Sequence, residues 1–212
     1  MILGAADGMP LHREEFARRY ESVIRAYLAA RWRASPRRSD VDDAVQEVFV
    51  ECFRDHGALA RVEPGRSGGF RAFLRGVVRN VARRVEERHA RRRERRAPHD
   101  FDVASDDESL GEVFDRAWAR ALVRQAFALQ MERARSQGDP EARRAELLRL
   151  RFVEGKTLGE IAADTDRDAG KLRYESARAL KEFEAALLEV VRRHHPDGDA
   201  PEECRRLLRY FG

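Results

Sequence analysis

The sequence predicts an all-α protein, and three observations support this prediction. Apolar residues recur at helical spacing in segment after segment, as at Phe70, Leu74 and Val77, which places them on one side of a helix. The 212 residues include only 14 glycines and 7 prolines, too few for the many turns of an all-β chain. Charged residues make up 38% and apolar residues 42% of the chain, which suits helices that bury one face and expose the other.

Three helices are predicted in a first domain over residues 10–96. The first covers residues 11–33, and the apolar residues on its buried side are Phe16, Tyr20, Val23, Ile24, Tyr27 and Leu28. The second covers residues 40–55, and Ser39 with Asp42 predicts a capping box at its start. The third follows Gly68 and Gly69, and its apolar stripe consists of Phe70, Phe73, Leu74, Val77, Val78, Val81 and Val85.

The second of these predicted helices, SDVDDAVQEVFVECFR, is apolar on one side and acidic on the other. Its apolar stripe consists of Val41, Ala44, Val45, Val48, Phe49, Cys52 and Phe53. Its outer face carries Asp42, Asp43, Gln46, Glu47 and Glu51. Such a face is either plain solvated surface or a docking site for a basic partner. Because Cys52 falls on the apolar stripe and the chain has only two cysteines, we expect a buried, reduced thiol and no disulfide framework.

A cluster of arginines follows the third apolar stripe directly. Eight arginines and only three glutamates lie between residues 83 and 96, although the net charge of the whole chain is only +4. Arg75, Arg79 and Arg83 fall nearly opposite the stripe. The cluster is either a solvated charged end or a rigid platform that presents cations to a polyanion. Residues 97–111, which are rich in acids, predict a flexible linker after it.

A second helical domain is predicted over residues 112–193. Its first helix covers residues 112–135, with a core of Phe114, Trp118, Leu122, Phe127 and Leu129. Three more helices are expected at about 140–153, 157–164 and 168–193, and Thr157 with Glu160 predicts a second capping box. The tail over residues 194–212 breaks at Pro196, and a short helix is expected from about residue 201.

Residues 157–178 follow the plan of a helix-turn-helix. A short helix leads into a turn at Thr165, Asp166 and Arg167, and the next helix carries polar and basic residues near its start. In this motif the second helix enters the DNA major groove, whose width accepts an α-helix. A short helical hairpin with no DNA role fits the same periodicity, so the pattern alone leaves both interpretations open.

In order and spacing, these motifs resemble bacterial RNA polymerase sigma factors of the extracytoplasmic-function (ECF) type. The segment DVDDAVQEVFVECFR is similar to the family's region 2 pattern D-x-x-D-x-x-Q-E-x-F, and FRAFLRGVVRNVARRVEERHARR is similar to the melting segment that follows it. The segment LRLRFVEGKTLGEIA, followed by ARAL, is similar to region 4. FDRAWARALVRQAFALQ and the tail ending in CRRLLRYF resemble a subgroup found in planctomycetes and myxobacteria.

This resemblance implies an alternative sigma factor with a region 2-like and a region 4-like domain. Its implied partners are bacterial core RNA polymerase, through the β′ clamp helices and the β flap, promoter DNA, and an anti-sigma factor as a further candidate. The implied polymerase-binding residues are Asp42, Asp43, Gln46 and Glu47. The residues implied at the −10 element are Phe70, Phe73, Arg79, Asn80, Arg83, Arg84, Arg88, Arg91 and Arg92. Those implied at the −35 element are Lys171, Arg173, Tyr174, Glu175 and Arg178.

The chain departs from the family pattern at three places. Thr165, Asp166 and Arg167 stand where the family has an aliphatic residue, a glycine and a second aliphatic residue. Arg84 stands where an Asp is common, and Ser176 replaces an apolar residue of the reading helix. For Phe70 and Phe73 we expect a place mostly in the core. Two of these three departures lie in the segment implied to contact the −35 element.

The sequence offers no coherent catalytic site, and we expect neither an enzyme nor a metal or organic cofactor. His194 and His195 adjoin Asp197 and Asp199, but adjacent histidines on a helix point in different directions. No segment resembles a signal peptide or a membrane span, so we expect a cytoplasmic protein. Two other functions are open: an autonomous dimeric helix-turn-helix regulator, and a helical adaptor that descends from the sigma fold and no longer binds DNA.

Overall fold

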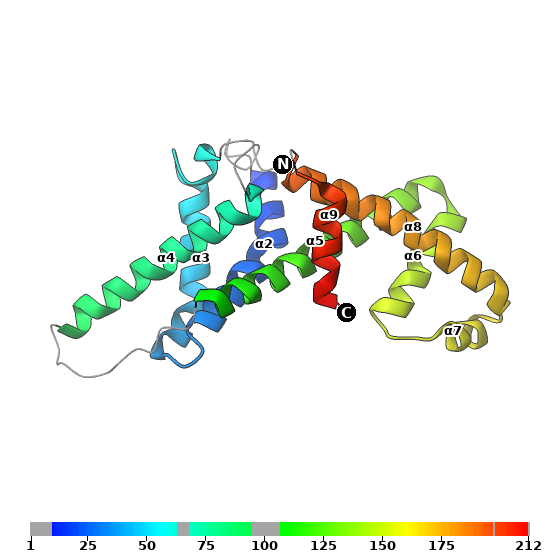
Figure 1. Cartoon of the computed structure of the whole chain (residues 1–212), viewed down its shortest axis with the longest axis horizontal. Helices are drawn as coiled ribbons and strands as arrows, with labels where there is room; N and C mark the ends of the chain where they lie inside the picture. The colour runs from blue at the N-terminus through cyan, green and yellow to red at the C-terminus, as the bar shows by residue number, and fades with distance from the viewer. Residues whose placement is uncertain (1–9, 63–67, 95–106, 197, 212) are drawn as a thin grey trace. The chain divides into compact units, whose positions relative to one another are not determined.

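The computed structural model describes residues 10–62, 68–94, 107–196 and 198–211 (Figure 1). Every regular element within these ranges is helical, which confirms the all-α prediction. The α-helices are α2 (Pro10–Arg31), α3 (Val41–Phe53), α4 (Gly69–Glu94), α5 (Asp107–Gln137), α6 (Asp139–Phe152), α7 (Leu158–Thr165), α8 (Ala169–His194) and α9 (Ala200–Leu208). Short 3-10 segments are η1 (Pro36–Asp40), η2 (Leu59–Arg61) and η3 (Arg209–Phe211).

The chain forms two compact units whose boundary differs from the predicted one. The first unit comprises residues 1–121, 194–198 and 206–212, and the second comprises residues 122–193 and 199–205. The predicted boundaries at residues 96 and 112 do not coincide with this division. Helix α5 already begins at Asp107, and Leu110 is buried, so the end of the predicted 97–111 linker is helical. The rest of that linker, up to residue 106, lies outside the described residues.

In the first unit, α3 packs against both α2 and α4 (Figure 1). The predicted stripe of α2 is wholly buried. The stripes of α3 and α4 are buried as well, except that Phe53 and Phe73 are partly exposed. Both cysteines are free, and burial raises the pKa of the Cys52 thiol to about 12, so this thiol is protonated and unreactive.

Aromatic rings fill the centre of the first unit. Tyr20 stacks on Trp118 with ring centroids 5.6 Å apart, and Phe70 lies against both rings. The Tyr20 hydroxyl lies 2.5 Å from Nε2 of His194, which is itself buried. His194 is therefore a core histidine, and no cluster of metal-ligating side chains occurs among the described residues.

One predicted helix cap is wrong. Pro36 starts the 3-10 segment η1 behind Ser35, whose hydroxyl accepts a hydrogen bond from the Arg37 amide. Ser39 consequently lies inside η1 and donates to the carbonyl of Pro36 instead of capping α3. The N-cap of α3 is Asp40, whose side chain makes no capping bond.

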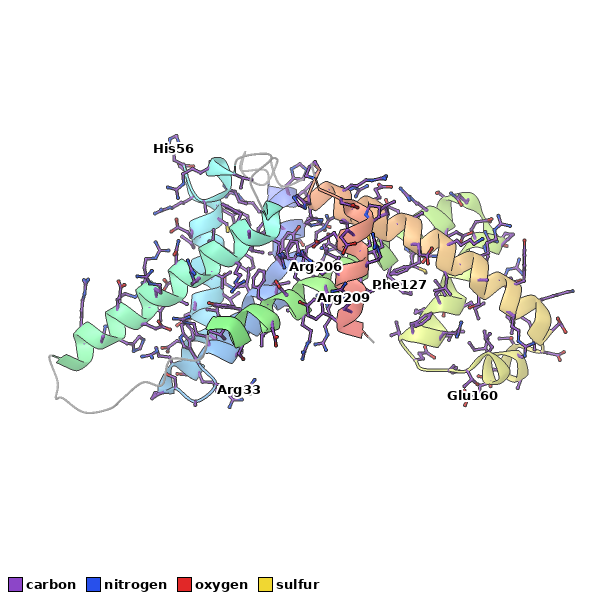
Figure 2. All side chains as sticks on the ribbon, in the orientation of Figure 1. Arg33, His56, Phe127, Glu160, Arg206 and Arg209 are labelled. Carbon is purple, nitrogen blue, oxygen red and sulfur yellow. The ribbon has the colours of Figure 1, made fainter. Side chains whose placement is uncertain are left out.

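In the second unit, α6, α7 and α8 enclose a small core of Leu147, Ile161 and Leu172. Phe127 of α5, marked in Figure 2, adds a ring contact with Phe183 of α8 at 5.2 Å. None of the helices in the described ranges is both long and apolar enough to cross a bilayer.

Candidate functional site

The acidic residues of α3 face outward, as predicted, but most of them have intramolecular partners. We call Asp42, Asp43, Gln46, Glu47 and Glu51 the α3 acidic face. Asp42, Asp43 and Gln46 are exposed, and Glu47 and Glu51 are partly exposed. Asp42 forms an ion pair with Arg25 of α2. No ion pair is described for Asp43, so a ligand would displace no described ion-pair partner to reach its exposed carboxylate.

Ion pairs join the α3 acidic face to the basic half of α4. Glu47 pairs with Arg88, and Glu51 accepts from Nη2 of Arg84 at 2.8 Å. Asp40, just before α3, lies 2.9 Å from Nε2 of His89. The Glu47–Arg88 and Asp40–His89 pairs lie in a groove of about 270 Å³ whose walls are Asp40, Asp43, Ala44, Glu47, Val85, Arg88, His89 and Arg92. Two predicted polymerase-binding residues, Asp43 and Glu47, therefore share a groove with two predicted DNA-binding residues, Arg88 and Arg92.

Glu51 is the most enclosed carboxylate of the α3 acidic face, with a side chain only 13% exposed. Besides Arg84, it contacts Arg54 at 2.8 Å and Arg61 at 3.6 Å. Burial alone would raise the pKa of Glu51, but the bond from Arg84 and the three positive charges outweigh burial and hold that pKa below its usual value. Glu51 is therefore ionised at neutral pH.

Other polar residues of α4 face solvent without such partners. We call Arg79, Arg83, Arg91 and Arg92 the open cations, because no ion pair is described for them and all four are exposed. Asn80 is exposed between the first two. A Cβ at Gly76, one turn earlier, would meet no atom within 4 Å, so this side of α4 is open to a ligand.

The aromatic residues predicted for the −10 element differ in accessibility. Phe70 is 5% exposed and lies among Phe16, Tyr20 and Trp118, so its ring has no face open to a base. Phe73 is partly exposed beside it, with ring centroids 5.6 Å apart. Phe70 is a core residue in this structure, in keeping with the expectation that both rings are mostly core.

The turn of the predicted helix-turn-helix forms despite its unusual residues. Thr157 and Glu160 make the predicted capping box at the start of α7; Figure 2 marks Glu160. Asp166 ends α7 in the left-handed conformation, with φ 50° and ψ 43°, where the family has glycine. Arg167 then pairs with Glu175 of α8, which ties the turn to the second helix.

The start of α8 presents most of the predicted −35 residues to solvent. Lys171, Arg173, Tyr174 and Arg178 are exposed, whereas Glu175 is partly covered by its bond to Arg167. An open hollow of about 540 Å³ beside them is lined by Arg144, Asp168, Gly170, Lys171, Tyr174, Glu175 and Arg178. The departure at Ser176 is also satisfied, because its buried hydroxyl accepts from Nη1 of Arg151 at 2.7 Å.

One residue and one ion pair that shape these surfaces were not predicted from the sequence. Arg144 lines the hollow, with a side chain 7% exposed, and donates to Glu141 at 2.7 Å and Glu182 at 2.8 Å. The Glu141–Arg144 spacing is a local signal for a helical ion pair, but the bond to Glu182, 38 residues away, has none. The role of Glu51 as the partner of Arg84 was likewise invisible before α3 and α4 were packed.

Comparisons with known proteins do not identify a family. No family model matches the sequence, and a search of curated proteins finds no significant match.

Proposed function

We propose that this chain is an alternative sigma factor of the extracytoplasmic-function type, which binds bacterial core RNA polymerase in the cytoplasm and directs it to promoters. The observation that carries the proposal is that the acidic face of α3 packs beside α4, a helix on which four exposed arginines have no described ion pair. An acidic face fits a basic protein surface, and open arginines fit DNA phosphates. The proposed role requires no catalytic residue and no cofactor.

The α3 acidic face is the proposed docking site for the β′ clamp helices. Asp43 is its best-placed residue because the carboxylate is exposed and has no described intramolecular partner. Glu47 is paired with Arg88 and Asp42 with Arg25, so each carboxylate must leave its arginine before it can bind a cation of the partner. The opposite side of α3 is committed to the core, so charge changes on the acidic face leave the packing intact.

Helix α4 is the proposed contact to the −10 element. Arg79 and Arg83 hold the strand by its phosphates, and the Asn80 amide between them can donate to and accept from a base edge. The burial of Phe70 leaves Phe73 as the aromatic side chain that can approach an unstacked base. In the second unit, Lys171, Tyr174 and Arg178 follow spacings of three and four residues and form one face about 10 Å long, which fits the major groove at the −35 element.

Gel filtration tests this proposal against its rivals. The full chain is mixed with sigma-free bacterial core polymerase, and then with fragments of host chromosomal DNA. A sigma factor co-elutes with the core enzyme. When nucleotides are supplied, the resulting complex also starts transcripts at defined positions on those fragments. A chain that binds duplex DNA tightly without polymerase is instead an autonomous regulator. If the chain binds neither polymerase nor DNA, it is neither a sigma factor nor an autonomous regulator, and the adaptor role remains.

A further inference from the structure

The cations of α4 fall into two sets with different environments. Arg84 and Arg88 are bound to Glu51 and Glu47 of α3, whereas Arg79 and Arg83 belong to the open cations. Only one turn separates Arg84 from Arg88, and Arg83 is the direct neighbour of Arg84. All four residues are arginines, so whether one is paired with an acid depends on its position around α4: Arg84 and Arg88 lie toward α3, and Arg79 and Arg83 do not.

An arginine held by a carboxylate is not freely available to a phosphate. The N–H group of Arg84 that donates to Glu51 must leave that oxygen before it can donate to DNA. The same holds for Arg88 and Glu47. Because Glu47 also belongs to the proposed docking surface, a basic partner and Arg88 compete for one carboxylate.

We propose that Glu47 and Glu51 hold Arg84 and Arg88 away from nucleic acid in the free chain, and that a basic partner docking on the α3 acidic face releases both arginines to DNA phosphates. The identity of that partner as core polymerase rests on the proposed function. The intramolecular hold, by which we mean the pairing of Arg84 with Glu51 and of Arg88 with Glu47, is independent of that function because it follows from the ion pairs alone. By linkage, the factor by which the bound partner strengthens DNA binding through these arginines equals the factor by which bound DNA strengthens partner binding.

The exchange leaves no buried charge without a partner. When Arg84 departs, Glu51 keeps Arg54 at 2.8 Å and Arg61 at 3.6 Å. Glu47 is 38% exposed and is solvated when Arg88 leaves. The remaining charges around the groove are Asp40, Asp43, His89 and Arg92, and the Asp40–His89 pair stays in place. Release is therefore reversible, unlike the breaking of a buried ion pair.

Two ion pairs, each with an exposed or half-exposed arginine, set the size of the effect. Pairs of this kind contribute modestly, and neutralising both carboxylates should tighten binding of free chain to single-stranded DNA about fivefold. That change corresponds to about 1 kcal/mol. Two additional phosphate contacts should also steepen the salt dependence by about 1.4 in the slope of log K against log salt.

The test measures anisotropy of a dye-labelled oligothymidylate of about 20 nucleotides with the full chain and no polymerase. The double variant Glu47→Gln/Glu51→Gln should bind about fivefold more tightly than its control, Glu14→Gln/Glu21→Gln. The control makes the same charge change on α2 and breaks the exposed Glu21–Arg25 pair, away from α4. Adding Arg84→Ala and Arg88→Ala to the double variant should remove the gain. Equal affinity of the double variant and control, or a gain that survives without the two arginines, overturns the proposal.

A second arm measures binding to core polymerase in the absence of DNA. Arg88→Ala frees Glu47 and should tighten this binding about twofold, the effect of one pair. Arg120→Ala, an exposed arginine of α5 with no described ion pair, is the control and should bind as the unaltered chain does. A gain on oligothymidylate together with no polymerase binding keeps the intramolecular hold and refutes the sigma function. Polymerase binding without any gain on oligothymidylate refutes the intramolecular hold and keeps the sigma function.

Discussion

Asn80 has the features of a recognition residue. Its amide is exposed on the open side of α4, flanked by Arg79 and Arg83, and no hydrogen bond is described for it. An amide that packed for stability would be expected to bond a neighbouring backbone or side chain. Its exposure therefore favours a contact with a ligand that is absent from the free chain.

Asn80→Ala should impair promoter melting by about 1–3 kcal/mol, the value of one good base contact. Binding to core polymerase and to closed duplex should stay near that of the unaltered chain, because phosphate contacts dominate those steps. Reactivity of unpaired thymines in the −10 region measures melting. If Asn80→Ala melts duplex promoter as well as the unaltered chain does, Asn80 has no base contact.

Glu86 is the residue whose ionisation most clearly stabilises the first unit. Its carboxylate accepts from Nε of Arg31 at 2.7 Å, from Nη2 of Arg31 at 2.9 Å and from the Trp32 indole at 2.9 Å. Burial alone would raise the pKa of Glu86, but these bonds outweigh it and lower that pKa below its ordinary value of 4.5. The stabilisation is thus complete above pH 4.5 and is lost as the pH falls through the lowered pKa.

Glu86→Gln should lower the free energy of unfolding by about 2 kcal/mol at neutral pH, because the charge-assisted bonds weaken. Below pH 4.5 the difference from the unaltered chain should shrink, since Glu86 is then protonated as well. Urea unfolding followed by circular dichroism at several pH values measures both effects. A difference that stays constant down to the acid transition contradicts this role for Glu86.

At the scale of elements, the turn between α7 and α8 shows how the chain tolerates an unusual residue. Asp166 adopts φ 50°, which favours glycine and costs other residues about 1 kcal/mol. Two contacts hold the turn: the Arg167 amide donates to the carbonyl of Ala162 at 3.1 Å, and the Arg167 side chain pairs with Glu175.

Asp166→Gly should therefore raise the free energy of unfolding of the second unit by about 0.5–1 kcal/mol. Ala163→Gly, three residues earlier on the exposed side of α7, should lower it by about 1 kcal/mol, because glycine is costly inside a helix. Thermal unfolding of the two variants measures both shifts. Destabilisation by both glycines would show that the side chain of Asp166 is needed at the turn.

The sequence predicted the helices well because helical periodicity is a local signal. The stripes of α2, α3 and α4 were found from spacing alone, and so was the capping box at Thr157. The cap at Ser39 was wrong because Pro36 starts a 3-10 turn that absorbs that residue.

At the scale of the whole molecule, contacts between distant segments could not be predicted. Tyr20 and His194 are 174 residues apart, and Glu47 and Arg88 are 41 apart. Their pairing depends on how helices cross, which periodicity does not specify. The result is that four predicted DNA-binding cations of α4 are exposed without a described ion pair, while Arg84 and Arg88 of the same helix are bound to acids of α3.

The proposed binding of core polymerase by the α3 acidic face is tested most directly at Asp43. Asp43 is exposed with no described ion pair, so reversing its charge breaks no internal contact. A surface change of this kind should alter stability by at most about 0.5 kcal/mol. Glu14→Arg on α2 makes the same change at an exposed position away from this face.

The decisive measurement is the affinity of the two charge-reversal variants for core RNA polymerase, with circular dichroism to verify folding. Asp43→Arg should abolish binding, and Glu14→Arg should bind as the unaltered chain does. Equal binding of Asp43→Arg and the unaltered chain would contradict the assignment of the α3 acidic face and, with it, the main support for a sigma factor.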